Sequence, residues 1–155
     1  MSAAQKITTF LTFNDQAEAA VTLYTSVFRN SKIVSTMPGP GGGVMSATFE
    51  LEGQRFIALN GGPSFTFAQG MSLLVNCETQ QEIDDYWARL TAGGGKPGQC
   101  GWLTDRFGVT WQIIPSVLGK LLGDKDPQRA GRAVQAMLAM TRLDIARLQA
   151  AADGK

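Results

Sequence analysis

The side chains best placed for chemistry lie in and around residues 105–115, DRFGVTWQIIP. The spacing from Asp105 to Gly108 is typical of a tight turn, because an Asp side chain accepts hydrogen bonds from nearby amides and Gly adopts a positive φ. Alternation of large apolar and polar residues then predicts a strand, with Trp111 toward a core and Gln112 on the other side. We therefore take the Gln112 side of this strand as the candidate ligand-binding face.

Histidine is absent from the chain, and its absence excludes whole classes of mechanism. Neither a Ser-His-Asp nor a Cys-His nucleophile can be built, and the usual His-containing zinc or iron site is excluded as well. Any catalysis must use carboxylates, Lys, Tyr, Cys or backbone donors.

Two further polar side chains occur beside glycines. Asn60 follows an apolar strand and precedes Gly61, where it could bind a small ligand or simply begin a turn. Cys100 precedes Gly101, and it is either a nucleophile, with Lys96 as the one neighbour in sequence able to lower its pKa, or an inert thiol.

The elements that carry these residues form a repeat. Residues 52–59 are a weaker copy of the turn and strand at 105–115, and the strands predicted at 7–13 and 71–75 are each followed by a helix. Two copies of a unit of roughly sixty residues predict a duplicated β-α-β-β arrangement. We expect an α+β protein with module one at about 5–62 and module two at about 70–115, both inside a domain spanning 1–125.

Capping signals mark the predicted helices. Asp15 and Glu18 resemble a capping pair for the first helix, and Thr79 with Glu82 forms a capping box for the helix of the second module. In the helical tail, 126–155, Asp126 and Asp144 are predicted N-caps. The apolar stripe of this tail covers either its own sheet or half of a dimer interface; it includes Met137, Met140, Leu143 and Leu148.

Charge and composition limit the binding partners and the cellular compartment that we expect for this protein. The formal net charge of +1 provides no field that would attract nucleic acid or an anionic membrane. No apolar run reaches membrane-spanning length, and the polar start of the sequence does not resemble a signal peptide. The two cysteines are too few for a secreted disulfide scaffold, so we expect a cytoplasmic protein with reduced thiols.

Several motifs together resemble the PhnB-like family, which is often labelled 3-demethylubiquinone-9 3-methyltransferase. They are ITTFLTF near the start, ALNGGP at 58–63, VNCET at 75–79, GQCGWL at 98–103, DRFGVTWQIIP at 105–115 and QAML at 135–138. This family belongs to the glyoxalase/bleomycin-resistance/dioxygenase group, also called vicinal oxygen chelate. The resemblance implies two tandem βαβββ modules whose strands form a curved, cup-like mixed sheet, with C-terminal helices, usually in a homodimer.

The resemblance also implies where a metal would be bound in related proteins. Metal-dependent relatives place His or Glu on the first strand of each module and Glu on the last strand. The corresponding stretches of this chain offer Thr8 or Thr9, Ser72, Ile57 and Gln112, which are poor ligands for a divalent metal. We therefore expect neither a metal nor another cofactor. The methyltransferase label is not carried over, because the sequence lacks the glycine-rich strand-to-helix turn of an adenosylmethionine-binding sheet.

Three interpretations follow. The first is a metal-free cup for a small planar or aromatic molecule of unassigned identity, formed by Phe10, Phe56, Trp102 and Trp111 with Asn60, Gln112, Thr8 and Ser72 as polar groups. The alternative is an enzyme, whether a lyase, an isomerase or the labelled methyltransferase, that uses Asp105, Glu50, Tyr24 or Cys100. In the third, all of these side chains serve the core and the turns.

Overall fold

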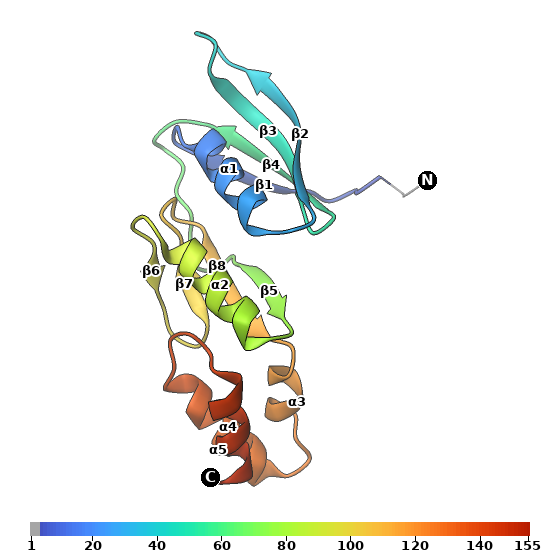
Figure 1. Cartoon of the computed structure of the whole chain (residues 1–155). Coiled ribbons are helices and arrows are strands. Elements are labelled where there is room, and N and C mark those ends of the chain that lie inside the picture. The colour runs from blue at the N-terminus through green and yellow to red at the C-terminus, as the bar shows by residue number, and fades with distance from the viewer. Residues whose placement is uncertain (1–3) are drawn as a thin grey trace. The chain divides into compact units, whose positions relative to one another are not determined.

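The computed structural model describes residues 4–155, and the chain divides between Thr66 and Phe67 into two units (Figure 1). Unit 1 ends at Thr66 and unit 2 comprises Phe67–Lys155. Each unit builds a four-stranded mixed sheet, and in each the first and last strands of the module are paired in parallel. The structure thus confirms the α+β class and the tandem modules. The boundary predicted between a domain at 1–125 and a tail at 126–155 stays a prediction.

Unit 1 has the strand order β1-β4-β3-β2. Its elements are β1 (Thr9–Phe13), α1 (Ala17–Val27), β2 (Ser31–Pro38), β3 (Val44–Leu51) and β4 (Gln54–Asn60). Figure 1 shows α1 lying along the sheet of this unit. Alternate strand residues, including Phe13, Phe49 and Phe56, are buried with Tyr24 of α1 in one core. The intervening residues, such as Phe10, therefore lie on the open face of the sheet.

The start of α1 differs from the prediction. Its N-cap is Gln16, and no side chain of the N-cap residue accepts a hydrogen bond from the helix. Asn60 Oδ1 instead accepts a hydrogen bond from the Ala17 amide at 2.8 Å. The capping pair expected from Asp15 and Glu18 is therefore wrong, because the last residue of β4 supplies the acceptor.

Unit 2 repeats the arrangement with the order β5-β8-β7-β6. Its elements are β5 (Leu73–Cys77), α2 (Gln80–Thr91), β6 (Lys96–Pro97), β7 (Trp102–Thr104) and β8 (Thr110–Pro115). The capping box at the start of α2 is confirmed, because Thr79 accepts a hydrogen bond from the Glu82 amide at 3.2 Å. The Glu82 carboxylate in turn accepts one from the Glu78 amide at 2.8 Å.

Three helices follow the second sheet: α3 (Leu118–Leu122), α4 (Pro127–Leu138) and α5 (Ile145–Asp153). Both predicted N-caps are confirmed, since Asp126 accepts from the Gln128 amide and Asp144 from the Arg147 amide, each at 2.9 Å. The apolar stripe of the tail is buried within unit 2; the buried cluster contains Leu118, Leu121, Ala133, Met140, Leu143, Leu148 and Ala152. Among residues 4–155, no helix is long and apolar enough to span a bilayer.

Candidate functional site

The turn that begins at Asp105 fixes the strand carrying Gln112. Asp105 Oδ1 accepts hydrogen bonds from the amides of Phe107, at 2.9 Å, and Val109, at 3.0 Å. Asp105 Oδ2 accepts a third from the Trp111 indole nitrogen at 2.9 Å. With Trp111 held on the core side of β8, the pleat directs Gln112 to the open face of the sheet.

Three neighbouring strands bring their side chains together on this open face. Gln112 of β8 is in register with Leu74 of β5 on one side and Trp102 of β7 on the other. Leu74 is 51% exposed, whereas Gln112 and Trp102 are half-buried. Leu74 is not among the site residues predicted from the sequence. The two-residue period of a strand, counted from Ser72, nevertheless places Leu74 on the same face as Ser72.

A hydrogen bond joins two of the predicted polar residues. Gln112 Nε2 donates to Ser72 Oγ at 2.8 Å, across 40 positions of sequence. Because this bond uses a single amide hydrogen, it leaves the Gln112 amide oxygen as an acceptor and the Ser72 hydroxyl hydrogen as a donor. The pair can therefore offer both kinds of hydrogen bond to one ligand.

Unit 1 has the same geometry with different chemistry. Thr8 directly precedes β1 as Ser72 precedes β5, and Phe10 is in register with Ile57 as Leu74 is with Gln112. Phe10 is 53% exposed, and Thr8 and Ile57 are half-buried. Ile57 therefore stands in unit 1 where unit 2 carries the Gln112 amide, and the open face of unit 1 is largely apolar there.

Asn60 faces the opposite way from Thr8 and Phe10. While its Oδ1 accepts from the Ala17 amide, its Nδ2 donates to the Val44 carbonyl at 3.0 Å. The side chain thereby connects the start of α1, the end of β4 and the start of β3. This position gives Asn60 a clear structural task in unit 1.

The other predicted residues of unit 2 lie away from the open face or in its adjoining turn. Trp111 is 2% exposed and bonded to Asp105. Cys100 is half-buried, with a φ of 59°, in the turn before Trp102. Cys77 is buried, and this burial, followed by the charges of Glu82 and Glu78, raises the pKa of its thiol to about 12.

The candidate acids and bases have structural partners. Asp105 is 3% exposed and accepts the three hydrogen bonds of its turn, and Tyr24 is fully buried in unit 1. The Glu50 carboxylate pairs with Arg55 at 3.1 Å and with Lys32 at 3.6 Å. The hydrogen bond from Arg55 is the main cause that lowers the Glu50 pKa.

The positions implied for a metal do not suit one. Thr8, Ser72 and Gln112 provide neutral hydroxyl and amide oxygens, and Ile57 provides no ligand atom. Such a set binds divalent metals weakly compared with imidazole and carboxylate. Throughout residues 4–155, no group of three or more His, Cys, Asp or Glu side chains is arranged to hold a metal ion.

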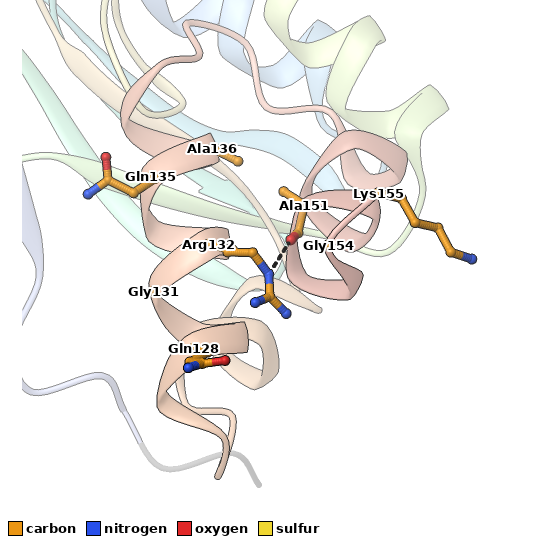
Figure 2. Close-up of a pocket in the computed structure, with 8 residues that line it drawn as sticks. All are labelled: Gln128, Gly131, Arg132, Gln135, Ala136, Ala151, Gly154 and Lys155. Carbon is orange, nitrogen blue, oxygen red and sulfur yellow. Dashed lines mark hydrogen bonds between the residues drawn. The ribbon is translucent and has the colours of Figure 1, made fainter.

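A separate groove of about 830 Å³ lies along α4 and the end of α5 (Figure 2). The residues lining it are Gln128, Gly131, Arg132, Gln135, Ala136, Ala151, Gly154 and Lys155. Arg132 Nε donates to the Ala151 carbonyl at 3.0 Å, and Arg132 Nη2 donates to the Ala152 carbonyl at 2.6 Å. Arg132 therefore holds the last turn of α5, and none of the predicted site residues lines the groove.

Comparison with solved structures finds relatives in sequence as well as proteins that are similar in fold alone. A "putative 3-demethylubiquinone-9 3-methyltransferase, PhnB protein" from Bacillus cereus is 41% identical, with a TM-score of 0.67, over 72% of this chain and 100% of that chain. A Pseudomonas aeruginosa protein is 20% identical, with a TM-score of 0.60, over 72% and 98%. The fosfomycin resistance protein FosX of Listeria monocytogenes, solved with Mn(II) and sulfate, is 15% identical, with a TM-score of 0.52, over 70% and 89%. The latter two show the fold alone.

Comparison of the sequence with models of protein families shows the family to which the chain belongs. No curated protein matches it. The model described as 3-demethylubiquinone-9 3-methyltransferase matches residues 5–114, which include both sheets up to the penultimate residue of β8 and exclude α3, α4 and α5. The chain therefore belongs to the PhnB-like family that carries the 3-demethylubiquinone-9 3-methyltransferase description, within the glyoxalase/bleomycin-resistance fold.

Proposed function

We propose that the chain binds a small planar or aromatic molecule and that the open face of unit 2 is one wall of the binding site. The observation that carries this proposal is the hydrogen-bonded pair of Gln112 and Ser72, set between Trp102 and Leu74. A few polar groups on an apolar wall are typical of small-molecule sites. The Trp102 ring offers a surface for stacking, and the pair fixes the orientation of the ligand.

The ligand that fits best is a planar molecule with an amide-like edge. Such an edge presents a donor beside an acceptor, which complements the acceptor of Gln112 and the donor of Ser72. Thr8 and Phe10 occupy the equivalent positions in unit 1, and the open face of that unit is proposed as a ligand-binding face of its own. Asn60, Trp111 and Cys100 are proposed to support the two modules rather than touch the ligand.

Binding is proposed to require no metal or other cofactor. Orientation then depends on hydrogen bonds and stacking, and the neutral oxygens of Ser72 and Gln112 suit this role better than metal chelation. The family description names a methyltransferase, but fold and family likeness alone are weak arguments for chemistry. Binding is favoured over catalysis because Asp105 and Tyr24 already serve the turn and the core.

The test uses 2-aminobenzamide, a fluorescent planar amide, as the probe. A ligand of this size is expected to bind with a Kd of about 1 mM. Gln112→Leu should raise the Kd about tenfold or more without lowering the urea midpoint, because it removes the orienting acceptor. The matched control is Gln54→Leu on an exposed end of β4, which should leave the Kd unchanged.

Two results would overturn the proposal. One is the lack of saturable binding by the wild-type protein at probe concentrations up to roughly ten times the expected Kd. The other is equal affinity of wild type and Gln112→Leu, which would remove Gln112 from the site.

A homodimer in the cytoplasm is proposed as the working state. Support for the dimer comes from the edge strand β2, where Ile33, Val34 and Met37 are exposed apolar side chains. Support for a reducing compartment comes from the unpaired thiols of Cys77 and Cys100. Native mass spectrometry should give a dimer for the wild type and a monomer for Val34→Lys; a wild-type monomer would contradict the assembly.

A further inference from the structure

The turn that leads into Trp102 is held by the C-terminal part of the chain. The Cys100 amide donates to the Met140 carbonyl at 2.8 Å, and the Gly101 amide donates to the Thr141 carbonyl at 2.7 Å. Both acceptors lie between α4 and α5, in a region that follows the residues matched by the family model. We call residues 140–145 the strap.

The turn has little room to adopt another conformation while the strap is in place. Gly101 has a φ of 83°, and a Cβ atom there would lie 2.8 Å from the Ile113 carbonyl oxygen and 3.1 Å from Leu143 Cδ1. Leu143 is 0% exposed. Cys100 has a φ of 59°, a left-handed conformation that non-glycine residues rarely adopt without support from their surroundings. The two hydrogen bonds to the strap provide that support.

Gln80, the first residue of α2, fastens the strap from the other side. Its Nε2 donates to the Leu143 carbonyl at 3.0 Å, and its Oε1 accepts from the Ile145 amide at 2.8 Å. An ion pair between Arg142 and Asp84, at 3.2 Å, adds a second connection to α2. The side-chain amide of Gln80 thus satisfies one backbone carbonyl and one backbone amide that the hydrogen bonds within α4 and α5 do not satisfy.

The same turn sets one side of the candidate ligand-binding face. The Trp102 amide donates to the Gln99 carbonyl at 3.0 Å, and the Ile113 amide donates to the Gly101 carbonyl at 2.8 Å. Trp102 is then in register with Gln112. The conformation at Cys100 and Gly101 therefore decides where the Trp102 ring stands relative to the Gln112 amide.

We propose that the strap is a positioning element for ligand binding: through the turn at Cys100 and Gly101 it orients Trp102 beside Gln112, and Gln80 is its positioning residue. This inference rests on the proposed function for the role of Trp102, and it goes further by giving α4 and α5 a part in the site. A strap that is loosened leaves the fold of unit 2 in place and lets the aromatic wall move away from the polar pair.

The experiment compares Gln80→Ala with Gln81→Ala, the same substitution at the next, exposed residue of α2. Nuclear magnetic resonance follows hydrogen exchange at the Cys100 and Gly101 amides and the indole signals of Trp102 and Trp111. In Gln80→Ala we expect exchange at both amides to be about tenfold faster and the Trp102 signal to shift. The Trp111 signal should stay in place, because Asp105 holds that indole.

The binding readout uses 2-aminobenzamide. Gln80→Ala should raise its Kd about threefold to tenfold, and Gln81→Ala should leave both the Kd and the Trp102 signal as in the wild type. Gln80→Glu keeps the acceptor for Ile145, removes the donor to Leu143 and to the Asp84 carboxylate, and places a second negative charge beside Asp84, so it provides a second variant that loosens the strap should Gln80→Ala fail to fold.

The outcomes separate this inference from the function on which it rests. A Trp102 signal and a Kd that do not change in Gln80→Ala or Gln80→Glu overturn the positioning role, whatever the amide exchange. If the wild type does not bind the probe, or if Gln112→Leu does not weaken binding, the proposed function fails instead. In that case the Trp102 signal alone decides whether the strap orients the ring.

Discussion

The carboxylate of Asp105 and the indole of Trp111 are joined by a hydrogen bond of 2.9 Å in the interior of unit 2. The two residues are 3% and 2% exposed. The same carboxylate accepts two backbone amides of the turn, so one side chain fixes both the turn and the first large core residue after it. Since Gln112 directly follows Trp111, this bond also determines which way the candidate ligand-binding amide points.

Asp105→Asn should destabilise the protein although it changes only one atom of the side chain. An Asn amide cannot accept from the turn amides and from the indole at once, so it places its own N–H groups against a buried donor. The expected loss in the free energy of unfolding is about 2 kcal/mol, measured by urea denaturation.

The control for this substitution is Asp126→Asn. Asp126 caps α4 through a single acceptor, and Asn is an equally good N-cap, so the expected change is about 0.5 kcal/mol or less. Equal destabilisation by the two substitutions would contradict the role of the Asp105 and Trp111 bond.

Asn60→Ala should destabilise unit 1 without affecting ligand binding. The substitution removes the acceptor for the Ala17 amide and the donor for the Val44 carbonyl, and the expected loss is about 2 kcal/mol. The control, Asn76→Ala on the exposed side of β5, should change stability by about 0.5 kcal/mol or less. A weaker affinity for 2-aminobenzamide at full stability would show that Asn60 contacts the ligand.

Much of the fold follows from local sequence signals. The Asp105 turn and the caps at Thr79, Asp126 and Asp144 were predicted because each depends on partners within about four residues. The alternation of residues in β8 likewise predicts that Trp111 and Gln112 lie on opposite faces of the sheet. These features need no knowledge of the tertiary structure.

Long-range contacts account for what the sequence did not reveal. The acceptor for the start of α1 comes from Asn60, 43 positions away, and Gln80 reaches Leu143 across 63 positions. In neither pair does a local sequence pattern predict the distant partner. The face on which Asn60 lies can be predicted from the sequence, because the two-residue period of β4, counted from the buried Phe56, places Asn60 on the buried side. The pairing of Gln112 with Ser72 needed the register of β5 on β8.

Glu50 should titrate below its ordinary pKa of 4.5, with Arg55 as the main cause. Arg55→Met should move the pKa back toward 4.5, and Lys32→Met should move it less, since Lys32 is 3.6 Å from the carboxylate and Arg55 is 3.1 Å. A carboxyl with a lowered pKa stabilises the folded state above its unfolded pKa, and this contribution is lost as the pH falls through the folded value. Carbon-13 titration of the Glu50 carboxyl checks the order of the two variants; a larger effect of Lys32 would contradict it.

The two thiols should react differently with a thiol reagent. At pH 8 the native protein should be labelled at Cys100 alone, and Cys77 should react only after unfolding, because it is buried and its pKa is about 12. The count of labelled thiols by mass spectrometry, before and after addition of urea, gives this result directly. Rapid labelling of native Cys77 would contradict its burial.

Cys77 should also make the protein less stable in alkali. Its pKa rises from an ordinary 9.0 to about 12 on folding, first through burial and then through the charges of Glu82 and Glu78. Between these values the unfolded thiol has lost its proton and the folded thiol has kept it, so the free energy of unfolding falls as the pH rises from about 9 to about 12. Cys77→Ala lacks this proton, and its stability should fall less steeply over the same range. Parallel pH profiles for the wild type and Cys77→Ala would show that the thiol is not desolvated on folding.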